Sequence, residues 1–258
     1  MHIKYHSDEE GVSMKKRTFP TFIRPVAALL AFTLACFTLC IGVPLQNAPT
    51  QSTNTASLAK SITVVLDAGH GGEDGGAVSS GGLIEKEVNL KITLLLAQML
   101  RANGINIVMT REKDELLYDK SINYQGRKKV LDLAKRKEIA EETENAIFIS
   151  IHMNTHPIKS CRGLQVWYSQ NHTLSKVLAQ SIQESTKTLL QPENDRDVKA
   201  ATSNIYLLHK LEIPAVLIEC GFLSNEDEAQ LLGDEDYQKA LALSLFLAIT
   251  HSDFLNHT

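Results

Sequence analysis

From residue 61 onward, short aliphatic runs alternate with amphipathic stretches. This alternation predicts a domain in which helices cover both faces of a sheet. Residues 62–67 form an aliphatic run without polar alternation, as expected for a central strand that is buried on both faces. Residues 87–102 carry apolar side chains at helical spacing and end at Asn103-Gly104, a typical helix terminus. The predicted fold is therefore α/β, a single open twisted sheet of about six strands flanked by helices on both faces.

The other elements follow the same alternation. Further strands are predicted at 106–110, 146–152, 164–168, 205–208 and 215–219. Further helices are predicted at 128–144, 173–190 and 236–254. Another helix is expected to begin at Asn225, because Asn225 and Glu228 have the spacing of a capping box.

The first 60 residues have a different composition. Residues 25–45 contain no charged side chain, and these 21 residues are enough to cross a bilayer, which takes ~20 apolar residues. Basic side chains precede this run at Lys15, Lys16, Arg17 and Arg24. This charge pattern places residues 1–24 in the cytoplasm and the chain after residue 45 outside it. Residues 46–60 are polar, as in a flexible linker. We therefore expect a membrane anchor at 25–45 and an extracytoplasmic folded domain at 61–258, with a cleaved signal peptide as the alternative.

Overall composition excludes some partners. The chain has 258 residues, 43% hydrophobic and 22% charged, with a net charge of −4. It lacks the basic surplus typical of a nucleic-acid-binding protein.

The chain has four cysteines. Cys36 and Cys40 lie in the apolar run, and Cys161 and Cys220 are far apart in sequence. The sequence leaves open whether the last two form a disulfide.

A glycine-rich turn, LDAGHGGEDGGAV at 66–78, follows the first predicted strand. Such turns often bind phosphate. However, neither the dinucleotide-binding pattern nor the P-loop pattern is present. Glu73 and Asp74 within the turn would also repel phosphate. We therefore expect no bound nucleotide.

Polar residues instead stand at the ends of several predicted strands. One predicted strand ends at Asp67, with His70 just beyond it, and two others end at His152 and Glu219. In open α/β sheets, ligands bind at the carboxyl edge of the strands. Two histidines and one carboxylate are a recurring ligand set for a hydrolytic Zn²⁺ ion. Glu85, predicted just before the helix at 87–102, can fold back to supply the carboxylate, which leaves Glu219 to move protons. Singly, a strand-end histidine or a first-turn glutamate has an ordinary structural role. The combination favours a metal site.

Several segments in this order resemble the amidase-3 family of zinc-dependent N-acetylmuramoyl-L-alanine amidases. They are LDAGHGGEDGGAV, LIEKEVNL, MTREKD, FISIHMN and PAVLIECGFLSNEDEAQLL. The resemblance implies that His70, Glu85 and His152 bind zinc and that Glu219 is the catalytic acid/base. It further implies hydrolysis of the amide between N-acetylmuramic acid and L-alanine in peptidoglycan. One departure is Ala68, where the family usually has proline.

Within the family, the N-terminal anchor and the single catalytic domain resemble the germination-specific amidases of spore cortex. That resemblance implies a step toward muramic-δ-lactam, and a vegetative autolysin is the alternative. Two other functions are possible interpretations of the sequence. One is a cysteine hydrolase that pairs Cys220 with His152, and the other is a wall-binding module without catalysis. The sequence does not identify any accessory protein.

Overall fold

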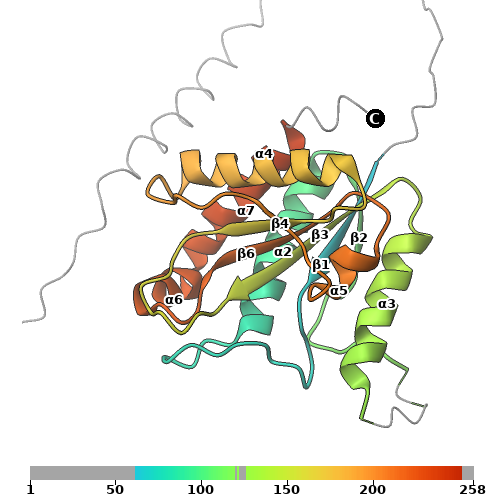
Figure 1. The fold of residues 1–258 in the computed structure, drawn as a ribbon, viewed down its shortest axis with the longest axis horizontal. Helices are drawn as coiled ribbons and strands as arrows, with labels where there is room; N and C mark the ends of the chain where they lie inside the picture. Colours follow the sequence, from blue (N-terminus) through green and yellow to red (C-terminus); the bar gives the residue numbers. More distant parts are fainter. Residues whose placement is uncertain (1–61, 120, 122–125, 252–258) are drawn as a thin grey trace, which may run out of the picture. The chain divides into compact units, whose positions relative to one another are not determined.

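The computed structural model describes residues 62–119, 121 and 126–251, and its centre is a six-stranded sheet (Figure 1). The sheet order is β2-β1-β3-β6-β4-β5. The strands are β1 (Thr63–Ala68), β2 (Asn106–Met109), β3 (Ala146–Asn154), β4 (Gln165–Tyr168), β5 (Lys199–Ala200) and β6 (Ala215–Phe222). The first four strands in this order run parallel, and β4 is antiparallel to β6. The predicted α/β fold with one open sheet is confirmed.

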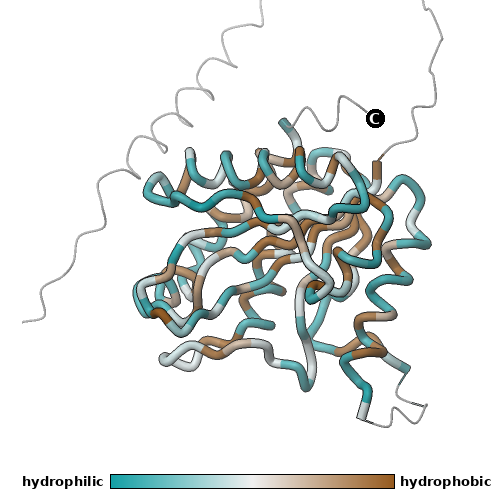
Figure 2. Tube along the Cα trace, in the orientation of Figure 1, coloured by the Kyte–Doolittle hydropathy of each residue, from teal (hydrophilic) through white to brown (hydrophobic). Residues whose placement is uncertain are grey.

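Helices cover both faces of the sheet. On one face lie α2 (Glu85–Ala102), α4 (Thr173–Leu189) and α7 (Glu235–Thr250), with α6 (Glu226–Gly233) against α7 and the end of β6. On the other face lie α3 (Lys128–Glu142) and the short α5 (Tyr206–Lys210). Figure 2 shows hydrophobic residues concentrated in the strands between these helices. The two faces therefore bury separate apolar clusters, which together fix the sheet.

Strand alternation directs the polar residues to one face. In β3, Ile149 and Ile151 are buried against the α2, α4 and α7 side. Because successive side chains of a strand point to opposite faces, His152 faces the α3 and α5 side. Glu219 is the register partner of His152 on β6 and lies on the same face. An irregularity follows immediately, since Asn154 pairs with Phe222 and β6 holds one extra residue there. Bulges of this kind are common beside active sites, where they redirect the chain.

One predicted strand is wrong. Residues 205–208 were expected to form a strand, but Tyr206–Lys210 is the helix α5. The buried residues are Leu207, Leu208 and Leu211, and Leu211 N donates to Leu207 O. Buried residues at positions i, i+1 and i+4 are typical of a helix. The sequence pattern shows this spacing only when Leu211 is included. The sixth strand is instead β5, whose two residues are too few to give a pattern.

Two site residues occupy different places in their elements from those expected. Glu85 is the first residue of α2 rather than a residue before it. Glu219 lies within β6, which continues to Phe222. The predicted cap at Asn225 is confirmed, because its side chain accepts a hydrogen bond from Glu228 N. The Glu228 carboxylate does not complete a capping box and instead accepts hydrogen bonds from Gly163 N and Phe222 N.

The N-terminal predictions fall outside the described residues. These are the cytoplasmic segment 1–24, the anchor 25–45 and the linker 46–60. Among the residues that the structure does describe, no helix combines the length and apolar character that crossing a membrane requires.

Candidate metal centre

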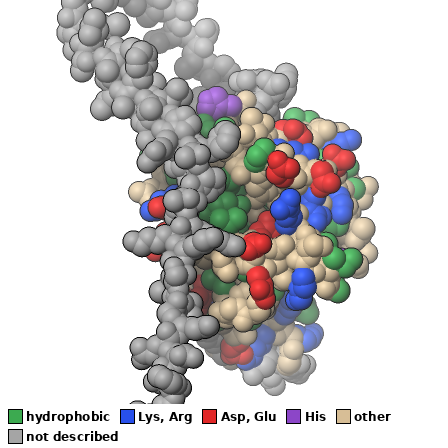
Figure 3. Space-filling model, turned by 90° about the vertical axis from the view of Figure 1, so that its left-hand side faces the viewer, with side chains coloured by type: hydrophobic (Ala, Val, Ile, Leu, Met, Phe, Trp, Pro, Cys, Tyr) green, Lys and Arg blue, Asp and Glu red, His purple; other side chains and the backbone are tan. Residues whose placement is uncertain are grey.

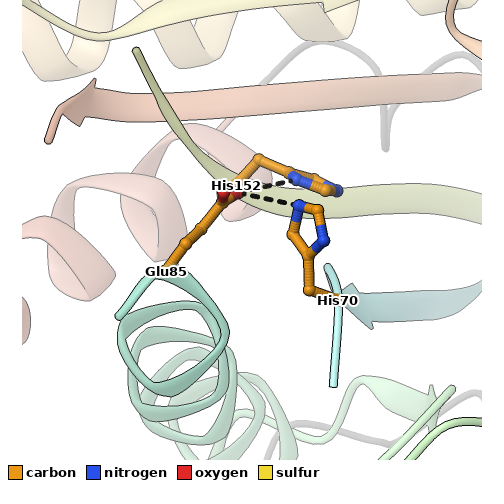
Figure 4. A group of neighbouring side chains, drawn as sticks. All are labelled: His70, Glu85 and His152. Atoms are coloured by element: carbon orange, nitrogen blue, oxygen red, sulfur yellow. Dashed lines mark hydrogen bonds and ion pairs between the residues drawn. The ribbon is translucent and has the colours of Figure 1, made fainter. Parts of the chain in front are cut away.

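Three side chains from separate elements converge at the carboxyl edge of the sheet. His70 follows β1, Glu85 begins α2 and His152 lies on β3 (Figure 4). Glu85 Oε1 lies 3.2 Å from His70 Nε2 and 3.0 Å from His152 Nδ1. One donor atom from each residue lies within 4.8 Å of the other two. The structure therefore brings together the two histidines and the glutamate that the sequence singled out.

The glycines of the turn make room for the imidazoles. A Cβ atom on Gly69 would lie 2.2 Å from His152 Nε2, and one on Gly76 would lie 2.5 Å from Glu85 Oε2. His70 itself has a φ of 61°, in the left-handed region that non-glycine residues rarely adopt. Such a conformation persists only when its surroundings enforce it. The glycines thus allow the side chains of His152 and Glu85 to lie close against the backbone of the turn.

The backbone fixes Glu85 in this position. Glu85 Oε2 accepts a hydrogen bond from Ala77 N at 2.8 Å, and Oε1 accepts one from Met153 N at 3.1 Å. The Asn89 side chain, one turn further along α2, donates to Gly69 O at 3.1 Å and to Glu85 Oε1 at 3.4 Å. Burial alone would raise the pKa of Glu85. The hydrogen bonds and charges of His152 and His70 outweigh burial and hold that pKa well below its usual value. Glu85 is therefore an anion at any ordinary pH.

Asp74 supports His70 from the other side of the ring. Its Oδ2 lies 3.0 Å from His70 Nδ1, which is close enough for an ion pair, but the geometry is not that of a hydrogen bond. Burial would lower the pKa of His70, but the carboxylates of Glu85 and Asp74 raise it. Metal-binding histidines commonly direct their second nitrogen to a carboxylate, which fixes the tautomer. Sequence reasoning took Asp74 only as a group that repels phosphate. The sequence signal for its contact with His70 was that the two residues are four positions apart.

Glu219 lies beside the cluster with one oxygen unsatisfied. Its Oε2 is shielded from solvent and has no hydrogen-bond partner among the described residues. Burial raises the pKa of Glu219 to about 7, against the lowering effect of His152. A carboxyl group with such a pKa can both accept and donate a proton near neutral pH. On the neighbouring antiparallel strand, Gln165 pairs with Glu219, and its buried Oε1 also lacks a partner within the described part of the chain.

Cys220 is unsuited to act as a nucleophile. It is fully buried and packs in the cluster on the α2, α4 and α7 side, the face opposite His152. Burial raises the pKa of its thiol well above the usual value, and the charge of Glu219 adds to this effect. The alternative interpretation, a cysteine hydrolase that uses Cys220 and His152, is therefore wrong. Cys161 and Cys220 are both free, so the disulfide left open by the sequence is absent.

Two buried arginines hold the backbone of the glycine turn. Arg136 on α3 donates to Ala68 O at 2.8 Å and to His70 O at 2.7 Å. Arg111 donates to Ala68 O at 2.8 Å and to Gly69 O at 2.9 Å. Asp67 pairs with Arg136 and accepts hydrogen bonds from Ser150 and Thr110, so this strand-end acid is part of the support rather than a reactive group. Sequence reasoning missed both arginines, because each sits in a charged stretch that resembles a solvated surface.

The three donor atoms fit a divalent transition metal. Zinc ligands lie about 2.0–2.2 Å from the ion, so two donors at a tetrahedral angle are about 3.4 Å apart. The distances from Glu85 Oε1 to the two histidine nitrogens are 3.2 and 3.0 Å. These two pairs would therefore need to separate by only a few tenths of an ångström, and the two histidine donor atoms lie within 4.8 Å of each other. Two nitrogens and one oxygen are also the donor types of hydrolytic zinc sites.

Comparison with known proteins identifies the family. The profile of the Amidase_3 family, described as N-acetylmuramoyl-L-alanine amidase, matches residues 64–251. The germination-specific N-acetylmuramoyl-L-alanine amidase of Bacillus subtilis is 37% identical over 186 residues, which cover 72% of this chain and 77% of that protein. The family match includes the turn, the start of α2, β3 and β6.

Solved structures give the same assignment. The CwlD amidase from Clostridioides difficile, solved in complex with the GerS lipoprotein, is 39% identical, with a TM-score of 0.71. The similarity covers 76% of this chain and 100% of that one. AmiC2 of Nostoc punctiforme is 30% identical with a TM-score of 0.61, over 73% of this chain and 95% of that one. The chain therefore belongs to the amidase-3 family of N-acetylmuramoyl-L-alanine amidases, enzymes that act on peptidoglycan.

Proposed function

We propose that the chain is a zinc-dependent amidase in which His70, Glu85 and His152 hold the ion and Glu219 transfers the proton. The observation that carries this proposal is the convergence of three donor atoms beside a buried carboxyl oxygen without a partner. Bound zinc supplies positive charge that polarises the substrate carbonyl and lowers the pKa of a water toward ~7 from ~15.7. The residues of the chain orient this chemistry and move the proton.

Glu219 acts in two successive steps. As general base it accepts a proton from the water that attacks the carbonyl between N-acetylmuramic acid and L-alanine. As general acid it then gives this proton to the alanine nitrogen while the carbon–nitrogen bond breaks. The transfer is needed because an amide nitrogen that left without a proton would be a very strong base. The products are a free muramic acid carboxylate and a peptide with a free amino terminus.

The proposed substrate is the peptidoglycan of spore cortex. Similarity to the germination-specific amidase of Bacillus subtilis, at 37% identity, supports this assignment. Removal of the peptide exposes the carboxyl group of muramic acid, which is required before it can close to muramic-δ-lactam. The complex of the similar CwlD chain with GerS makes a lipoprotein a candidate accessory partner here.

We also propose that residues 25–45 anchor the protein in the membrane, with residues 61–258 as an extracytoplasmic catalytic domain. The uncharged run, its basic flank and the polar segment 46–60 support this arrangement. A flexible linker of 15 residues spans roughly 20 to 25 Å on average, by the rule of ~5–6 Å × √n. An anchored enzyme would therefore act on glycan close to the bilayer.

Digestion of spore-cortex peptidoglycan tests the activity. We expect the zinc-loaded full-length chain to release peptides with free N-terminal alanine and to leave peptide-free muramic acid, both detected by mass spectrometry. Glu219→Gln should bind zinc at the same stoichiometry but turn over ~10²- to 10⁴-fold more slowly, because the amide cannot carry the proton. An inactive wild-type chain would contradict the proposed function. Loss of zinc from Glu219→Gln would make Glu219 a ligand instead.

Zinc affinity tests the shape of the turn. An added methyl group in Gly69→Ala would meet the His152 ring, so the ring must turn away. We expect zinc to bind about 10- to 100-fold more weakly, as when a ligand loses its orienting group. Competition with a chelator measures this. Gly75→Ala is the matched control, because its Cβ would meet only Ile84 at an ordinary 3.5 Å. Equal zinc affinity in the two variants would show that the close approach at Gly69 does not position His152.

Cell fractionation tests the anchor. We expect the full-length chain to remain in the membrane fraction of its host after a carbonate wash, because an apolar span is not released by high pH. A soluble mature form whose first residue lies within 46–60 would instead identify 25–45 as a cleaved signal peptide.

A further inference from the structure

A closed ring of hydrogen bonds joins the tip of the glycine-rich turn to the start of α2. Asp114, in the loop after β2, accepts a hydrogen bond from Gly72 N through its Oδ1 at 2.7 Å. Its Oδ2 accepts a second one from Lys86 Nζ, also at 2.7 Å. Lys86 Nζ completes the ring by donating to Gly72 O at 2.8 Å. Two charged side chains therefore hold both backbone groups of Gly72.

The loop after β2 also packs directly against the turn. A Cβ atom on Gly71 would lie 2.2 Å from Glu115 O, and one on Gly72 would lie 3.0 Å from Leu116 N. Gly72 has a φ of 54°, in the left-handed region that glycine adopts without strain. The two glycines thus let the loop approach closely enough for Asp114 to reach the backbone of the turn.

Ordinary surface charge does not account for this arrangement. Figure 3 shows that acidic and basic side chains are interspersed on one face of the molecule, and exposed ion pairs contribute little to stability. Lys86 differs because its side chain is only 15% exposed and makes two hydrogen bonds at once. Lys86 is also the second residue of α2, where a cation interacts unfavourably with the helix dipole. The stability of α2 therefore gives no reason for a lysine at this position.

The ring connects to the metal centre at both ends. Within the turn, Gly71 and Asp74 exchange backbone hydrogen bonds at 2.9 and 3.0 Å. The carboxylate of Asp74 lies 3.0 Å from His70 Nδ1. On α2, Lys86 directly follows Glu85, whose Oε1 lies 3.2 Å from His70 Nε2 (Figure 4). The ring thus links the two segments that carry these two proposed ligands.

We propose that Lys86 and Asp114 are positioning residues for the metal centre. They fix the tip of the turn against α2, and so hold His70 at the distance from Glu85 that an ion needs. This inference rests on the proposed function, because it takes these last two side chains as zinc ligands. The direction of the hydrogen bonds matters, since the side chain at 86 must donate to Gly72 O and the one at 114 must accept from Gly72 N.

Zinc affinity of the full-length chain, measured by competition with a chelator, tests the proposal. We expect Asp114→Ala and Lys86→Met each to weaken zinc binding about 10-fold, the lower end of the range for groups that orient metal ligands. Amidase activity should fall at limiting zinc and return to the wild-type rate at saturating zinc, because neither side chain takes part in the reaction.

A charge-swapped variant separates positioning from simple ion pairing. Lys86→Glu with Asp114→Lys keeps two opposite charges, but it can neither donate to Gly72 O nor accept from Gly72 N. We expect this variant to bind zinc as weakly as Asp114→Ala. Lys86→Arg, which keeps the charge and the donor, should bind zinc more tightly than Lys86→Met.

An ion pair at the other end of α2 gives the matched control. Arg101, in the last turn of α2, pairs with Glu112 of the loop after β2 at 3.0 Å. Arg101→Gln with Glu112→Gln therefore removes a link between the same two segments and should leave zinc affinity unchanged. In metal-free protein, the amide of Asp74 should exchange faster in Asp114→Ala than in this control, because the turn is no longer held at its tip.

The outcomes distinguish the positioning role from the proposed function. Wild-type zinc affinity in Asp114→Ala, in Lys86→Met or in the charge-swapped variant would overturn the positioning role while the ligand assignment stood. An equal loss of affinity in the control, or inactivity of Asp114→Ala at saturating zinc, would overturn it as well. A wild-type chain that bound no zinc would overturn the proposed function itself.

Discussion

The buried ion pair between Arg136 and Asp67 is the interaction on which the site depends. Both side chains are almost completely shielded from solvent. A buried ion pair contributes little net stability, but loss of one partner costs about 3–5 kcal/mol because the other charge remains buried. Burial would raise the pKa of Asp67, but Arg136 and the hydroxyl groups of Ser150 and Thr110 lower it. Asp67 therefore stays ionised and holds Arg136 in place, and Arg136 in turn holds two carbonyl groups of the glycine-rich turn.

This support explains how a glycine-rich loop can position a histidine accurately. Glycine has more conformational freedom than any other residue, so a turn with five glycines would be poorly ordered by itself. Hydrogen bonds from Arg111 and Arg136 to Ala68, Gly69 and His70 remove that freedom. The left-handed conformation of His70 is held in the same way. The backbone thus places the three proposed ligands in the arrangement that a metal ion would need.

The sequence predicts those parts of the structure that depend on local pattern. The aliphatic runs before Asp67, His152 and Glu219 identify three adjacent parallel strands, and their common carboxyl edge brings the polar residues together. The run at 205–208 was misassigned because four residues without Leu211 do not distinguish a helix from a strand. The support of the turn was not predictable in this way. Arg136 lies in a highly charged helix, and only the tertiary structure shows that it alone among the nearby basic residues of α3 turns inward.

Amide hydrogen exchange of the turn in metal-free protein tests the central claim most directly. In the structure Gly69 N donates to Ile151 O, and Gly71 and Asp74 are joined by hydrogen bonds between their backbones. If the arginines form the turn, these three amides should keep their protection within about tenfold when a chelator removes the metal. Exchange at the rate of an unfolded chain in the chelated protein, with the amides of β1 and β3 still protected, would show that the metal rather than the buried ion pair orders the site.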